Sequence, residues 1–271
     1  MLSRRGFLLG TALTATARGQ TRPASVVLAI VEGSAMVSIA GGVAFNRCYK
    51  ADPNPARGLE AILHGRFPHN GGLTGNPGGT ALPDVLKAAG ISCTVASLPP
   101  ALPDESLLVV VSTPASHDET WLDKSTRVPL LLFRWPRRIA PAPLDLLVST
   151  VDIMPTVLGL CGVPAPDDLQ GPDLSGWLLR GAGQRPESVY AEGRIGTRDS
   201  WRMIVRGLDK LVFTPRLDIL HLYNLGQDPD ETTDLASDPA EQRKRDELSA
   251  IAADWMRRLG DHMDPSGLKR R

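Results

Sequence analysis

Residues 26–31 read Val26-Val27-Leu28-Ala29-Ile30-Val31, an unbroken apolar run rich in β-branched side chains. A short run of this kind predicts a strand buried on both faces, as in a parallel sheet. The chain offers further candidate elements, namely strands at 92–98, 107–111 and 128–133 and helices at 81–90 and 151–161. Strands that alternate with helices predict an α/β fold with a mostly parallel sheet flanked by helices.

The pattern changes after about Gly181. Short apolar segments at 189–191, 202–205 and 210–213 predict a small antiparallel sheet. A helix is expected from Pro239 to Leu259, with Asp238 as its N-cap and Pro239 as its first residue. We therefore expect an α/β domain over residues 21–180 and a C-terminal subdomain of the same fold over residues 181–271.

The N-terminus has the order of a secretory signal. Arg4 and Arg5 precede a short apolar stretch, and Ala15-Thr16-Ala17 fits a cleavage site with small residues. Paired arginines before Phe7-Leu8-Leu9 resemble a twin-arginine signal, and the apolar run is too short to span a bilayer. The sequence thus predicts that residues 1–20 are a signal peptide. The mature chain is expected to be periplasmic or extracellular, in a bacterium, with no stable membrane span.

The charge balance and the cysteine spacing argue against nucleic-acid binding and against a zinc or C-x-x-C site. Lys plus Arg is 30 and Asp plus Glu is 30, so no basic excess points to nucleic acid. The three cysteines, Cys48, Cys93 and Cys161, are too widely spaced for a zinc or C-x-x-C pattern. They are expected to be buried apolar residues.

Several segments occur in the order found in one enzyme family. These are Arg127-Val128-Pro129-Leu130 to Arg134-Trp135-Pro136, Val151-Asp152-Ile153-Met154-Pro155-Thr156, Leu169-Gln170-Gly171, and Leu222-Tyr223-Asn224-Leu225 to Asp228-Pro229. Together with Gly42-Val43-Ala44-Phe45 and Gly65-Arg66-Phe67-Pro68-His69, they resemble the sulfatase family of the alkaline-phosphatase superfamily. The resemblance extends over more than half of the chain.

The resemblance implies hydrolysis of a sulfate ester by a formylglycine, made from Cys or Ser in C-x-P-x-R. The matching stretch here is Asp52-Pro53-Asn54-Pro55-Ala56-Arg57. Pairing Pro55-Ala56-Arg57 with P-x-R places Pro53 at the nucleophile, and counting from Tyr49 places Pro55 there. Neither proline can become formylglycine, so the nucleophile is missing.

The family's calcium ligands are also incomplete. The first strand ends Val31-Glu32-Gly33, where the family has two aspartates, and Ser112-Thr113-Pro114 follows the strand that should supply a second pair. Calcium takes ~6–8 oxygen ligands, so Glu32 alone is an insufficient metal site. Residues 97–101 replace the family's K-x-H. Arg57 and Lys124 are the remaining candidates for catalytic residues, and we expect neither calcium nor formylglycine as a cofactor.

Three interpretations remain open. We expect an exported sulfatase-like protein without hydrolytic activity, with a sulfated or anionic small ligand as its candidate partner. The alternatives are an active sulfuric ester hydrolase with a rearranged site and a decayed sulfatase gene product. An active enzyme would need a nucleophile beside an activating group, and none is visible in the sequence.

Overall fold

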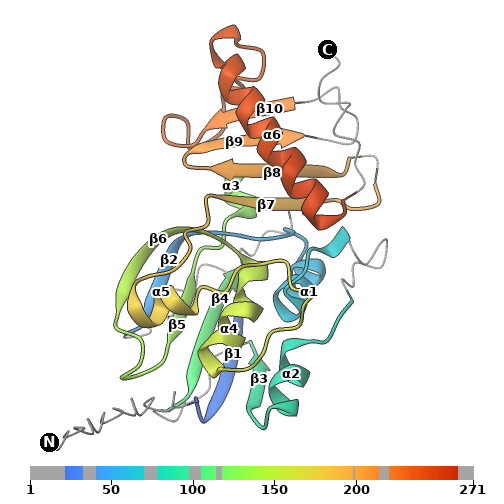
Figure 1. Cartoon of the computed structure of the whole chain (residues 1–271). Coiled ribbons are helices and arrows are strands. Elements are labelled where there is room, and N and C mark those ends of the chain that lie inside the picture. The colour runs from blue at the N-terminus through green and yellow to red at the C-terminus, as the bar shows by residue number, and fades with distance from the viewer. Residues whose placement is uncertain are drawn as a thin grey trace, which may run out of the picture.

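The computed structural model describes residues 22–32, 41–69, 78–97, 105–113, 118–197, 199–213 and 220–261. The predicted signal peptide lies outside these ranges. The described chain forms a six-stranded sheet and a four-stranded sheet, stacked end to end (Figure 1).

The six-stranded sheet has the order β3-β1-β4-β5-β2-β6. Its strands are β1 (Ser25–Glu32), β2 (Val43–Tyr49), β3 (Ser92–Ala96), β4 (Leu107–Thr113), β5 (Leu131–Arg134) and β6 (Ala142–Ser149). β1 pairs in parallel with β3 and β4, and β2 pairs in parallel with β6. β5 is antiparallel to both β4 and β2, so the other five strands share one direction. The mostly parallel sheet predicted from the sequence is confirmed.

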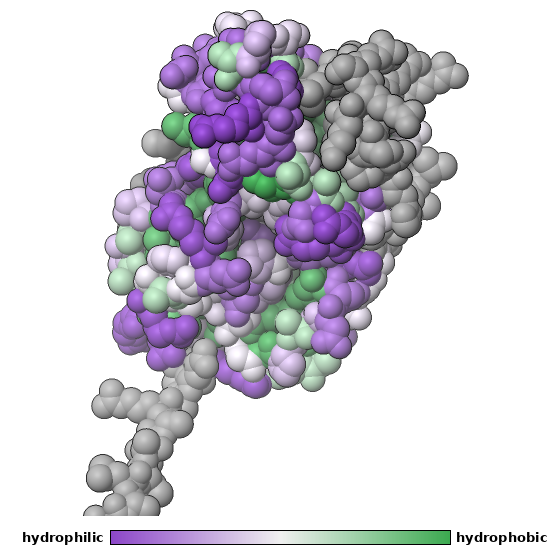
Figure 2. All heavy atoms as spheres, turned by 45° about the horizontal axis from the view of Figure 1, so that its top comes forward, coloured by the Kyte–Doolittle hydropathy of each residue, from purple (hydrophilic) through white to green (hydrophobic). Residues whose placement is uncertain are grey.

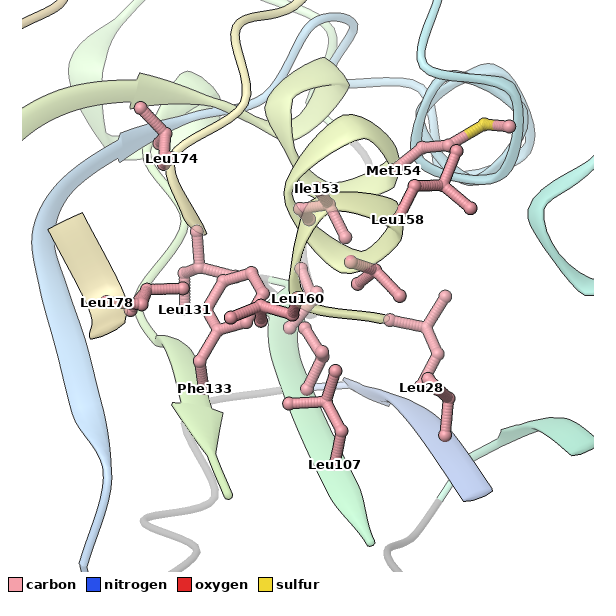
Figure 3. Close-up of a cluster of buried hydrophobic side chains, with 14 of the residues drawn as sticks. Leu28, Leu107, Leu131, Phe133, Ile153, Met154, Leu158, Leu160, Leu174 and Leu178 are labelled. Atoms are coloured by element: carbon pink, nitrogen blue, oxygen red, sulfur yellow. The ribbon is translucent and has the colours of Figure 1, made fainter. Parts of the chain in front are cut away.

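Helices that follow the strands cover this sheet. They are α1 (Pro55–His64), α2 (Leu82–Ala88), α3 (Asp123–Thr126), the 3-10 turn η2 (Thr150–Asp152), α4 (Ile153–Cys161) and α5 (Ser175–Arg180). Figure 3 shows α4 packing Ile153, Leu158 and Leu160 against Leu28 and Leu107 of the central strands. A fully buried Leu or Ile side chain contributes about 1.5–3 kcal/mol, which makes this cluster the main support of the sheet.

The four-stranded sheet is antiparallel, in the order β10-β9-β8-β7. It consists of β7 (Ser188–Gly193), β8 (Trp201–Arg206), β9 (Asp209–Phe213) and β10 (Leu220–Asn224). The helix α6 (Gln242–Leu259), preceded by the 3-10 turn η3 (Pro239–Glu241), lies across one face of it (Figure 1). Asp238 caps that turn by accepting from the backbone N–H of Ala240, as expected.

Side chains from both sheets share one core cluster. Ala51, Ala61 and Phe67, which belong to the region of the large sheet, are buried together with Tyr190 of β7 and Leu248 of α6. On the face shown in Figure 2, hydrophobic residues appear as small separate patches among hydrophilic ones. Within the ranges that the structure describes, no helix combines the length and apolarity needed to cross a membrane.

The sequence analysis missed β2, β6 and β10. In β2 a register shift between Phe45 and Arg47 breaks the alternation of apolar and polar residues. β6 and β10 are edge strands, and an edge tolerates Pro143 and polar residues that obscure a strand pattern. The strand expected from Val128 begins only at Leu131, after Pro129.

Candidate functional site

The carboxyl ends of three strands meet at one edge of the large sheet. Glu32 at the end of β1 lies beside Thr113 at the end of β4, and β2, which runs the same way, ends at Tyr49. In open α/β sheets, ligands bind beyond this edge. A cavity of about 540 Å³ lies here, between the strand ends and the start of α1. Figure 1 shows α1 at the end of the large sheet that faces the smaller one.

The loop from β2 to α1 forms one wall of this cavity. Asn54 is the N-cap of α1, and its Oδ1 accepts from the backbone N–H groups of Ala56 and Arg57, both at 3.1 Å. Pro55 occupies the first turn, where a missing N–H costs no helical hydrogen bond. The helix ends at Gly65, which has the left-handed φ of 62° that favours glycine.

A chain of ion pairs crosses the start of α1. Arg57 Nε lies 2.6 Å from Asp52 Oδ2, and Arg57 Nη2 lies 2.7 Å from Glu119 Oε2. Asp52 is fully buried, and its Oδ1 also accepts from the backbone N–H of Asn54 at 2.8 Å. Burial raises the pKa of Asp52 to about 6, against the lowering effect of Arg57. Glu119 also accepts from Asn54 Nδ2 at 2.7 Å, so these four side chains form one network.

The three predicted site residues do not converge on the cavity. Glu32 lines it but is exposed to solvent. Arg57 is held between Asp52 and Glu119. Lys124 is exposed on α3 and does not belong to the described lining of the cavity. Their proposed roles therefore stay predictions.

The residues of the cavity do not fit a formylglycine or a calcium ion. Pro53 and Pro55 line the wall where a nucleophile would stand, and neither has a side chain that can be oxidised to an aldehyde. Both oxygens of Asp52 are bound by Arg57, and Asn54 Oδ1 caps a helix. In the described lining, Glu32 is the one carboxylate outside these pairs, far fewer ligands than calcium requires.

Two residues near the cavity were not singled out from the sequence. Glu119, in the loop before α3, is the second partner of Arg57. Lys50, directly after β2, lines the cavity and is only 6% exposed. Burial lowers the pKa of Lys50 to about 8, while Asp52 opposes the shift. Its position just after a strand, at the carboxyl edge of the sheet, is the sequence signal that could have identified it.

A second cluster of ionisable groups joins the small sheet to the end of α6. Atoms of His69, Glu192 and Asp261 lie within 4.8 Å of one another, as in a metal site. However, Arg202 Nε lies 2.5 Å from Asp261 Oδ2 and 3.4 Å from Glu192 Oε2. The guanidinium supplies the positive charge, so this cluster is an ion-pair network. Burial would lower the pKa of His69, but the hydrogen bond and charge of Glu192 together with the charge of Asp261 outweigh that effect, so the pKa is raised.

Comparisons with known proteins agree on one family. The family model for N-sulphoglucosamine sulphohydrolase, C-terminal, matches residues 117–254. An endo-4-O-sulfatase of Bacteroides thetaiotaomicron is 50% identical over 50 residues, which are 18% of this chain and 10% of that protein. The matched segment thus spans about a tenth of this curated relative.

Solved structures show the same fold over most of the chain. A protein in complex with its substrate D-glucosamine-2-N,6-O-disulfate has a TM-score of 0.75 at 13% identity, covering 92% of this chain and all of that one. A 2-O glycosaminoglycan sulfatase has a TM-score of 0.73 at 13% identity, covering 93% and 97%. The phosphonate monoester hydrolase of Agrobacterium radiobacter has a TM-score of 0.70 at 11% identity, covering 88% and 96%.

Proposed function

Since the chain belongs to the sulfatase family, we propose that it is an exported member that does not hydrolyse sulfate esters and instead binds a sulfated or anionic small ligand. The cavity at the carboxyl ends of β1, β4 and β2 is the proposed binding site. Neither calcium nor formylglycine takes part in this function.

The observation that carries the proposal is the pair of prolines in the cavity wall. Pro53 and Pro55 stand where the family's reaction would begin, and a proline ring offers no nucleophile. Two threonine hydroxyl groups of the cavity lining have no activating partner among the described residues. Thr150 Oγ1 accepts from the backbone N–H of Ala51 at 2.9 Å, and Thr113 Oγ1 lies 3.5 Å from the carbonyl of Val31. Neither has a general base as its described partner, which a hydroxyl nucleophile needs.

The hydrogen bonds of Arg57 also support the proposal that the protein does not hydrolyse sulfate esters. An arginine that stabilises a transition state must direct free N–H groups toward the developing charge. Arg57 instead directs Nε and Nη2 to Asp52 and Glu119, and these two carboxylates more than neutralise it. Arg57 is also absent from the described lining of the cavity, so its guanidinium does not face a ligand bound there.

The proposed ligand class follows from the family and from the cavity. One relative in the family's fold was solved with a sulfated sugar, its substrate. Here the cavity keeps Lys50 as a buried cationic group, and its described lining includes neither Arg57 nor Lys124. Export is proposed from Arg4 and Arg5 and the apolar run that follows them.

Sulfate release is the direct test. The protein is produced with and without the formylglycine-generating enzyme and incubated with 4-nitrophenyl sulfate and with D-glucosamine-2-N,6-O-disulfate. We expect no release above that of the Arg57→Ala variant. The Pro53→Cys variant, which restores C-x-P-x-R, is expected to stay inactive because the metal ligands are still missing. Release by the unmodified protein that Arg57→Ala abolishes would favour an active enzyme with a rearranged site.

A further inference from the structure

The groups that most often bind an anion at a strand–helix junction are already satisfied here. Pro55 has no N–H, and Asn54 Oδ1 accepts from Ala56 and Arg57. The backbone N–H of Gly58 donates to the carbonyl of Asn54 at 2.7 Å. The first turn of α1 therefore has no free N–H to offer a ligand. Arg57, as described above, is held by two carboxylates.

Lys50 is the exception. Its side chain is 6% exposed and lines the cavity, and the Asp52 carboxylate is the described charge that acts on its ammonium. Asp52 is the nearest candidate partner in the loop, but its oxygens are bound by Arg57 and by the N–H of Asn54. Burial disfavours the charged form of Lys50, and a ligand that brings an anionic acceptor into the cavity would offset that cost.

The rest of the cavity limits what such a ligand can be. Its walls are mostly apolar and include Ile30, Leu59, Ile62, Val111 and Val128. Its volume of about 540 Å³ is within the range of small-molecule sites. Within the described lining, Lys50 is the one cationic side chain, and Glu32 at the solvent side disfavours a second negative charge on the ligand.

We propose that this cavity binds an organic monoanion with an apolar body, such as an aryl carboxylate, whose anionic group pairs with the Lys50 ammonium. The hydroxyl of Thr150, which lines the cavity and accepts from Ala51, keeps its own proton to donate to the same group. This inference rests on the proposed function, since it takes the cavity to be a binding site. It differs from a site for sulfated sugars, whose several hydroxyl and sulfate groups would face apolar walls.

Isothermal titration calorimetry with matched probes tests the proposal. The probes are 4-methylbenzoate, its neutral analogue 4-methylbenzamide, acetate as the anion without an apolar body, and D-glucosamine-2-N,6-O-disulfate. We expect 4-methylbenzoate to bind most tightly. The Lys50→Met variant should lose about 10- to 100-fold in affinity for it, as for the loss of one hydrogen bond to a charged group, and should leave 4-methylbenzamide unaffected. Lys87→Met, a change of an exposed lysine on α2, should bind like the unmodified protein.

Three outcomes would overturn this inference: no binding of 4-methylbenzoate, binding that Lys50→Met leaves unchanged, or tighter binding of the disulfated sugar. In the last case the proposed function would stand, because the protein would still bind a sulfated ligand. Free sulfate is measured in the same samples. Its release from the sugar would contradict the proposed function, whereas the dependence of 4-methylbenzoate binding on Lys50 would be unaffected.

Discussion

Replacing Lys50 with methionine is expected to stabilise the protein at neutral pH. The pKa of Lys50 is about 8, against 10.5 for an unperturbed lysine, because burial disfavours its charged form. Each pH unit between two such values corresponds to about 1.4 kcal/mol, so the buried charge costs roughly 3 kcal/mol. Methionine is unbranched and of similar length, so it should fill the same space without the charge. The loss of ligand binding and the gain in stability are thus expected from the same substitution.

The pH dependence of the stability difference between the two proteins distinguishes the removal of the buried charge from a change in side-chain packing. Above pH 8 the folded protein has released the Lys50 proton, while the unfolded chain keeps it until about pH 10.5. In that window the unfolded state binds more protons, so the unmodified protein gains stability as the pH rises. The advantage of Lys50→Met should therefore be complete below pH 8 and should shrink toward pH 10.5.

Urea unfolding of both proteins at pH 7 and pH 10 measures this difference. Comparing the two proteins at each pH cancels the titration of the groups that they share and that do not interact with Lys50. Lys87→Met serves as the control for the loss of an exposed lysine. A stability difference that is the same at both pH values, or a variant less stable than the unmodified protein at pH 7, would refute the reasoning.

Two further predictions concern export and calcium. Residues 1–25, fused to a reporter that must fold before export, should direct that reporter across the membrane. Changing Arg4 and Arg5 to lysine should stop the export. Export that this change leaves unaffected would contradict the twin-arginine assignment. Millimolar calcium should leave the melting temperature unchanged, although a site with Kd ~100-fold below the added calcium would give roughly 2.7 kcal/mol. A rise of several degrees that Glu32→Gln abolishes would show that a calcium site persists.

The sequence predicted the elements whose patterns are set by burial. β1 and β4 are central strands, so both of their faces are apolar and the runs Val26–Val31 and Leu107–Val111 are continuous. α4 was predicted up to its final residue because Gly162, with a φ of 60°, ends it. β6 was not predicted because it is an edge strand, which pairs with a neighbouring strand on one side only. Such a strand tolerates residues that are unusual in a central strand, here Pro143 and Asp145.

The site could be predicted only in part, because the partners of its side chains come from distant parts of the sequence. Comparison with the family's C-x-P-x-R motif shows which expected residues are absent. It predicted a proline, Pro53 or Pro55, at the position of the nucleophile. It does not show which of the remaining groups already have partners. Arg57 pairs with Glu119, 62 positions away, and that contact depends on the loop before α3 lying against the start of α1. Lys124, in contrast, was a candidate from the sequence but lies exposed on α3.

Pro55 also helps to explain why the surrounding groups are satisfied. Pro55 suits the first turn of α1, and Asn54 before it caps the helix and binds Glu119. Asp52, Asn54 and Arg57 thus hold the loop in place through their mutual hydrogen bonds. Proteins depart from local stability rules mainly at functional sites. The Lys50 side chain, buried in a mostly apolar wall, is such a departure, and the proposed binding function of this cavity rests on it.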